Sequence, residues 1–154
     1  MAKKGGYGIG IVGCGMIADF HARAIEAMRG GHLACVFSRS KANADRVARA
    51  FDCASYQNYT AFLDHPGLDI VVIATPSGAH LEPCLQAAKA GKHIICEKPL
   101  EVTLERVDRM IQACDQNGVM LAGIFPRRFN DATAVFKRAV DSGRLGKITL
   151  ADAY

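Results

Sequence analysis

The sequence lacks the features of a membrane-spanning, secreted or nucleic-acid-binding protein. No apolar run of about eighteen residues, the length that crosses a bilayer, occurs among its 154 residues. The segment from Met1 to Gly6 carries two lysines but is not followed by the apolar core of a signal peptide. The 19 basic residues are scattered among 15 acidic ones, without a basic block, so the net charge of +4 does not indicate nucleic acid. These absences predict a cytoplasmic protein with neither a membrane nor a nucleic acid as partner.

The cysteines lack the spacing of a metal site or of a disulfide framework. None of the six forms a C-x-x-C pair, and most lie inside apolar segments. We therefore interpret them as ordinary buried thiols in a reducing compartment, and we predict no bound metal. They are Cys14, Cys35, Cys53, Cys84, Cys96 and Cys114.

What the sequence does have is a regular alternation of apolar strands and amphipathic helices. Hydrophobic residues make up 50% of it, enough for the core of one domain and part of a second. The strands are predicted over 7–12, 33–37, 68–74, 92–96 and 119–123. The helices are predicted from about 16, over 43–51 and 60–63, from the cap Ser77 to Gly91, from the cap Thr103 to about 117, and over 132–140. This alternation predicts an α/β fold with a doubly wound parallel sheet, whose ligand site lies at the carboxyl ends of the strands.

The first predicted strand leads into a G-x-G-x-x-A turn and then into a helix. Gly13 permits the sharp turn, Gly15 leaves room for a pyrophosphate to approach the backbone, and Ala18 lets the helix lie close to the strand. The helix N-terminus is a site for anions. Ile17, Phe20, Ala24 and Met28 recur at helical spacing and predict the apolar face of this helix. A glycine-rich turn can be only a turn, but three further polar or special loops follow strands at the same edge. The turn residues predicted to bind a dinucleotide are Gly13, Cys14, Gly15, Met16 and Ile17.

The end of the second predicted strand bears on the choice of cofactor. NAD-binding domains place an Asp or Glu about 20 residues beyond the glycine motif, where it accepts a hydrogen bond from the ribose 2′-OH. Here that place holds Ser38, followed by Arg39, with Lys41 nearby. Ser38 can donate to a 2′-phosphate and Arg39 can pair with it, so the sequence favours NADP over NAD. The alternative for Arg39 is a solvated charge, or a guanidinium that stacks on adenine without discriminating between the two.

Three motifs in sequence order resemble the Gfo/Idh/MocA oxidoreductases, the family of glucose–fructose oxidoreductase and inositol dehydrogenase-like enzymes. They are Gly13 to Ala18, Ala74-Thr75-Pro76 with His80, and Gly91 to Pro99, which contains Glu97-Lys98-Pro99. Arg127-Arg128-Phe129 and the segment 143–148 also look like the part of the family that enters its second domain. The resemblance covers nearly the whole chain and implies a Rossmann domain.

The resemblance also implies roles for matching residues. Lys98 looks like the catalytic lysine near the nicotinamide and the substrate hydroxyl, and Glu97 like a residue on the ribose side of the cofactor. Thr75, Pro76 and His80 look like the wall beside the cofactor, although an ordinary helix-surface histidine is an equal reading of His80. A solvated lysine is the alternative for Lys98. A cis bond between Lys98 and the following proline would be consistent with the family.

One position departs from the family. Pro126 stands where the family often has Asn or Gln before an arginine, so no role is transferred to this loop. We expect residues 1–123 to form the dinucleotide-binding domain. Residues 124–154 are expected to form a connecting segment and the first helix and strand, from Lys147, of a truncated second α+β domain.

The activity that the resemblance implies is hydride transfer between a nicotinamide cofactor and a hydroxyl-bearing carbon of a sugar, cyclitol or related small molecule. It also implies that the full-length protein is a homo-oligomer and that this chain alone is inactive. Two alternatives stay open. One is a stand-alone dinucleotide-binding module or regulator without catalytic activity, and the other is a doubly wound domain that binds some other nucleotide.

Overall fold

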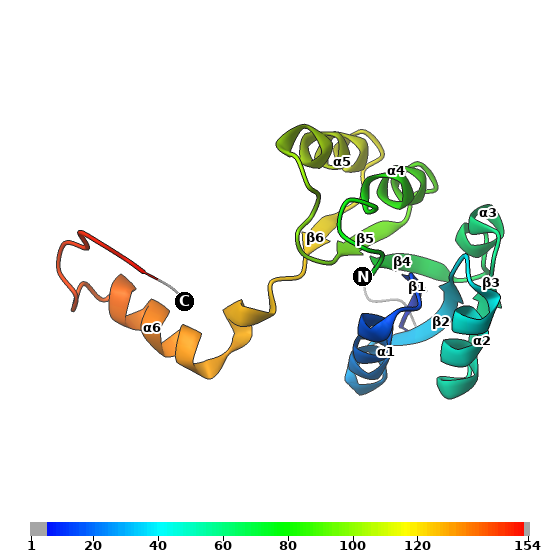
Figure 1. Ribbon diagram of the computed structural model, residues 1–154, viewed down its shortest axis with the longest axis horizontal. Helices are drawn as coiled ribbons and strands as arrows, with labels where there is room; N and C mark the ends of the chain where they lie inside the picture. Colours follow the sequence, from blue (N-terminus) through cyan, green and yellow to red (C-terminus); the bar gives the residue numbers. More distant parts are fainter. Residues whose placement is uncertain (1–5, 153–154) are drawn as a thin grey trace. The chain divides into compact units, whose positions relative to one another are not determined.

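The structure is a computed structural model that describes residues 6–152 (Figure 1). The chain divides into two compact units, one ending at Ile124 and the other beginning at Phe125. None of the helices in the described range is long and apolar enough to cross a membrane.

The first unit is built on a six-stranded sheet in the order β3-β2-β1-β4-β5-β6, and every neighbouring pair is parallel. The chain builds outward from β1 on one side and then crosses back to lay β4 on the other side. This reversal between β1 and β4 is the topological switch point of a doubly wound sheet, so the predicted fold class is confirmed. The strands are β1 (Tyr7–Val12), β2 (Gly31–Phe37), β3 (Ala54–Tyr56), β4 (Leu68–Ile73), β5 (His93–Cys96) and β6 (Leu121–Gly123).

Helices cover both faces of this sheet, as Figure 1 shows for α1 and α2 on one side and α4 and α5 on the other. Two buried clusters correspond to the two faces, one beneath α1 and α2 and the other beneath α3, α4 and α5. Phe62 of the second cluster is fully buried, in the space that the missing side chain of Gly10 leaves open. The helices are α1 (Met16–Ala27), α2 (Lys41–Ala50), α3 (Tyr59–Leu63), α4 (Leu81–Lys89) and α5 (Leu104–Gln116).

The predicted apolar face of α1 is wrong. Phe20 is 66% exposed and Met28 is 44% exposed, whereas Ala18, Ala22 and Ile25 are buried against the sheet. Small alanines allow a helix to approach the strands closely. The helical spacing of apolar residues does not reveal which of two possible helix faces packs against the sheet.

Two predicted helix starts had different outcomes. Thr103 is the N-cap of α5, and its side chain accepts a hydrogen bond from the backbone N–H of Arg106, as predicted. Ser77 does not cap α4, which begins at Leu81. The reason is Gly78, whose φ of +83° is left-handed, so a right-handed helix cannot pass through it.

The cysteines have the environment that was predicted. All six are free, and five are buried while Cys53 is half-buried. Burial raises the pKa of Cys35 and of Cys96 to about 12, so both thiols are protonated at neutral pH.

The second unit contains a 3-10 helix, η1 (Pro126–Phe129), and α6 (Asp131–Asp141). Residues 126–129 were predicted as a loop and residues 132–140 as a helix. The predicted strand from Lys147 is not formed over 147–152, and its residues 153–154 lie outside the described range. A strand needs a neighbouring strand to satisfy its backbone N–H and C=O groups, and an apolar pattern alone does not supply one.

Candidate functional site

A cavity of about 830 Å³ opens at the carboxyl ends of β1, β2 and β4, where the doubly wound fold places its ligands. Its lining comes from the glycine turn and the start of α1, from the end of β2, from the segment after β4, and from α2, α3 and α4. Nine of the predicted site residues line it together: Gly13, Cys14, Gly15, Met16, Ile17, Ser38, Arg39, Thr75 and Pro76.

The two glycines of the turn have different tasks. Gly13 has a φ of +97°, and a Cβ there would lie 2.6 Å from the carbonyl oxygen of Ala74. Its N–H donates to the carbonyl of Phe37 at 2.9 Å, which ties the turn to β2. Gly15 is the N-cap of α1, and a Cβ there would meet no atom within 4 Å. Gly13 therefore serves the fold, whereas the missing side chain of Gly15 keeps space open at the start of the helix.

Cys14 contributes its backbone rather than its thiol to this turn. The thiol is buried and lies 3.5 Å from the carbonyl oxygen of Phe37. Burial raises the pKa of Cys14 to about 11, and the positive charge of Arg46 only partly offsets this. The thiol is thus protonated at neutral pH and is not a nucleophile.

An ion pair that the sequence analysis missed supports the start of α1. Arg46 of α2 lies 2.9 Å from the carboxylate of Asp19, which is in the first turn of α1, and it also donates to the carbonyl of Cys14 at 3.4 Å. A carboxylate at this end would repel a bound anion, and the guanidinium beside it reduces that repulsion. No local pattern could reveal a pair 27 residues apart.

The end of β2 presents hydroxyls and a cation to the cavity. The Ser38 hydroxyl accepts from the N–H of Ser40, whose own hydroxyl caps α2. Arg39 is exposed at the rim. Lys41, which lies near these two residues in the sequence, pairs with Asp45 at 2.6 Å.

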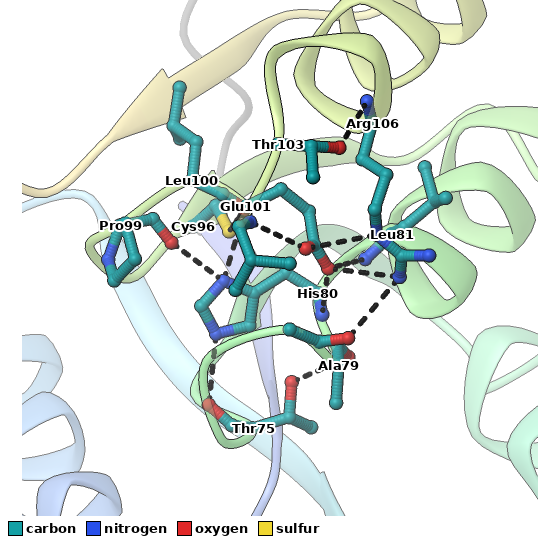
Figure 2. A network of polar contacts seen from close by, with 12 residues as sticks. Thr75, Ala79, His80, Leu81, Cys96, Pro99, Leu100, Glu101, Thr103 and Arg106 are labelled. Carbon is teal, nitrogen blue, oxygen red and sulfur yellow. Dashed lines mark hydrogen bonds and ion pairs between the residues drawn. The ribbon is translucent and has the colours of Figure 1, made fainter.

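The wall opposite the glycine turn was only partly foreseen. The hydroxyl of Thr75 donates to the carbonyl of Ala79 at 2.9 Å and closes the turn after β4 (Figure 2). Tyr59 donates to the carbonyl of Pro83 at 2.8 Å, and burial raises the pKa of its phenol. The helix predicted between Ser77 and Gly91 carried no sequence signal that its residues reach the cavity. The lining residues that were not predicted include Asn43, Tyr59, Glu82, Pro83 and Gln86.

Glu97 and Lys98 follow β5, beyond the lining of this cavity. The Glu97 carboxylate lies 3.0 Å from Nε2 of His21 on α1, and it also accepts from the N–H of Lys98 at 3.0 Å. Both side chains of the Glu97–His21 pair are nearly buried, whereas Lys98 is exposed. The bond between Lys98 and Pro99 is cis. His21 is a second residue that sequence reasoning missed, since its partner lies on a distant strand.

His80 lies behind the wall and lines no part of the cavity. It is 1% exposed, so it is not a helix-surface histidine either. Its Nε2 is 2.9 Å from the carbonyl oxygen of Thr75, and its Nδ1 is 2.9 Å from that of Pro99 (Figure 2). The ring therefore joins the loop after β4 to the loop after β5.

Residues 7–125 match the family described as "Oxidoreductase family, NAD-binding Rossmann fold", the Gfo/Idh/MocA family. The chain belongs to this family. The NAD-binding Rossmann domain of the family is thus the part that carries the cavity and the glycine turn.

Proteins to which the chain is similar include ones named as dehydrogenases. The chain is 34% identical over 139 residues to a scyllo-inositol 2-dehydrogenase (NAD(+)) of Bacillus subtilis, a match that covers 89% of this chain and 41% of the relative. The chain therefore spans less than half the length of this enzyme.

Solved structures of the family superpose closely on the chain. The WlbA dehydrogenase of Bordetella pertussis, in complex with NADH and UDP-GlcNAcA, gives a TM-score of 0.89 at 30% identity, covering 93% of this chain and 42% of its own. The scyllo-inositol dehydrogenase of Lactobacillus casei, with bound NAD(H) and scyllo-inositol, gives a TM-score of 0.86 at 31% identity. This match covers 94% of this chain and 43% of the other.

Proposed function

We propose that the chain is the cofactor-binding part of a dehydrogenase that acts on a hydroxyl-bearing carbon of a sugar, cyclitol or related small molecule. The observation that carries this proposal is the open space at Gly15, where the N-terminus of α1 meets a cavity continuous with the end of β2. A dinucleotide needs an anion site for its pyrophosphate and a polar edge for its adenosine ribose, and this cavity offers both.

Different residues of the chain would bind different parts of such a cofactor. Backbone N–H groups from Gly13 to Ile17 would hold the pyrophosphate, and Ser38 and Arg39 would receive the adenosine ribose. Thr75 and Pro76 would form the wall beside the cofactor. When bound, the nicotinamide accepts or supplies the hydride, and the protein positions the reactants.

Lys98 is the residue that we propose takes the hydroxyl proton of the substrate. Its side chain is exposed at the carboxyl end of β5. Glu97 beside it is oriented by His21, so the backbone at this point is fixed before any substrate arrives. A lysine held at a defined place can act as general base once it is deprotonated.

We propose further that NADP(H) binds more tightly than NAD(H). The rim of the cavity at the end of β2 has Ser38 and Arg39 where an NAD-binding domain has a carboxylate. The relatives named above are described with NAD(+), NADH or NAD(H), so a preference for NADP would set this chain apart from them.

Replacement of Arg39 by Ala is expected to remove most of that preference. A charge-assisted hydrogen bond to a phosphate contributes about 1.5–3 kcal/mol, so roughly a tenfold to hundredfold difference between the two cofactors is at stake. Titrations with NADPH and NADH, followed by cofactor fluorescence, measure it. Arg49→Ala on the exposed side of α2 removes the same charge away from this cavity and should leave the ratio unchanged. A wild-type chain that prefers NADH would contradict the assignment of Arg39.

The chain by itself is expected to bind cofactor without appreciable turnover of any polyol or sugar. Lys98 can offer a proton acceptor, but the orientation of a substrate against the nicotinamide can contribute about 7–11 kcal/mol, and one exposed lysine does not supply it. Coupled assays of the 154-residue chain with inositols and sugars test this expectation. Robust turnover would show that the residues of this chain orient the substrate unaided.

A further inference from the structure

Glu101 is a buried carboxylate that holds the loop carrying Lys98 against α4 and α5 (Figure 2). We propose that Glu101 and Arg106 form a positioning pair that fixes Lys98 relative to the nicotinamide. This inference rests on the role proposed above for Lys98, and it adds two residues to the reaction that no sequence motif had indicated.

The Glu101 carboxylate accepts hydrogen bonds from several backbone N–H groups, and this is the first observation that supports the proposal. One oxygen accepts from the N–H groups of His80 and Leu81, at 3.1 and 3.2 Å, where α4 begins. The other oxygen accepts from the N–H of Val102 at 2.7 Å. A carboxylate at a helix N-terminus is favoured by the positive end of the helix dipole. The side chain of Glu101 is thereby fixed to α4.

Arg106 adds a second element to this arrangement. Its Nη2 donates to one oxygen of Glu101 at 3.2 Å, and its Nε lies 3.0 Å from the other. The same Nη2 donates to the carbonyl of Gly78 at 3.2 Å. The guanidinium thus connects α5, the loop after β4 and the loop after β5 at one point.

The charge state of Glu101 favours a positional role over one as acid or base. Burial by itself raises the pKa of this carboxyl, but hydrogen bonds from Arg106 and from the N–H groups of Val102, Leu81 and His80 outweigh it. The resulting pKa is about 2. Glu101 is therefore a permanent anion at neutral pH, and its contribution is positional.

Lys98 lies between fixed neighbours on both sides. Before it, Glu97 is held by His21, and its N–H donates to the carbonyl of Ile73 at 3.0 Å. After it, the carbonyl of Pro99 meets the ring of His80, and Glu101 is held as described. The exposed side chain of Lys98 consequently projects from a backbone segment that is anchored at both ends.

The variant Arg106→Met tests the pair because it loosens Glu101 from α5 and leaves the carboxylate at the start of α4. Arg106→Lys serves as a conservative second variant. Arg109→Met, an exposed change on the same helix, is the matched control. Thermal unfolding of each variant shows that it is folded.

Two ligands separate the two halves of the cofactor site. ADP-ribose lacks both the nicotinamide and the 2′-phosphate and reports on the pyrophosphate and ribose parts of the cavity between Gly15 and Arg39, whereas NADPH also reports on the nicotinamide end. We expect Arg106→Met to leave the affinity for ADP-ribose unchanged. Its affinity for NADPH should fall by roughly two- to tenfold, the equivalent of one hydrogen bond, and the emission of bound NADPH should shift toward that of the free cofactor. Arg106→Lys should recover part of both effects.

The decisive comparison is made in the background Lys98→Met. If Arg106 acts through Lys98, Arg106→Met should change neither the affinity nor the emission further once Lys98 is gone. Effects of the two substitutions that add up would overturn the positioning role, as would unchanged emission in Arg106→Met. A wild-type chain that binds neither ADP-ribose nor NADPH would instead reject the proposed cofactor site and the pair with it.

Discussion

The variant Gly15→Val is expected to lose cofactor binding while its fold stays intact. A side chain at Gly15 meets no atom of the protein within 4 Å, and the residue already has the extended backbone, with φ of −78°, that valine readily adopts. The added methyl groups would instead occupy the space of the pyrophosphate. The loss of two charge-assisted hydrogen bonds, about 3 kcal/mol or more, weakens binding about a hundredfold or more.

A cofactor titration together with circular dichroism measures both parts of this expectation. Ala24→Val is the matched control, since it places the same β-branched residue on an exposed position of the same helix. It should bind cofactor as the wild type does. Near-normal affinity in Gly15→Val would move the cofactor away from the start of α1 and would overturn the site.

The variant Gly13→Ala is expected to lose folding stability, in contrast to Gly15→Val. At a φ of +97° any L-residue is strained, which costs about 1–3 kcal/mol. The new Cβ would also lie 2.6 Å from the backbone carbonyl of Ala74, so β1 and the segment after β4 must move apart. Overpacking of this kind costs about a further 1–3 kcal/mol. The sum is a large share of the stability of a small domain.

Urea unfolding of Gly13→Ala measures that loss, and a matched glycine separates its two causes. Gly67 has a φ of +80°, but a Cβ there would meet no atom within 4 Å, so Gly67→Ala carries the strain without the clash. We expect Gly67→Ala to lose clearly less stability than Gly13→Ala. Equal losses would show that the close approach of Gly13 to Ala74 has no energetic consequence.

The sequence by itself was sufficient for the order of the elements and for most of the cavity. A strand buried on both faces contains an apolar run without polar breaks, as over 70–73, and a turn with a positive φ selects glycine, as at Gly13. The carboxyl ends of parallel strands meet at one edge, so the sequence alone groups the residues after β1, β2 and β4. These inferences succeed because each depends on local chemistry or on a general rule of topology.

Other features depend on which segments pack together, and a linear pattern does not contain that information. The helical spacing of apolar residues in α1 predicted that Phe20 is buried. The face that packs against the sheet instead contains Ala22, because close packing favours alanine over a bulky ring. His80 could not be placed from its motif, since its burial depends on carbonyl groups of two separate loops.

The polar pairs that support the site were likewise decided by the tertiary structure. Arg46 meets Asp19, and His21 meets Glu97, across separations of 27 and 76 residues. A charged side chain can pair with any opposite charge that the fold brings near, so its partner is not encoded in its neighbours. The sequence therefore determined the doubly wound sheet and the glycine turn, because backbone conformation and burial leave local patterns. Only the tertiary structure decided how Glu97 and Lys98 are held, because their contacts come from helices that are distant in the chain.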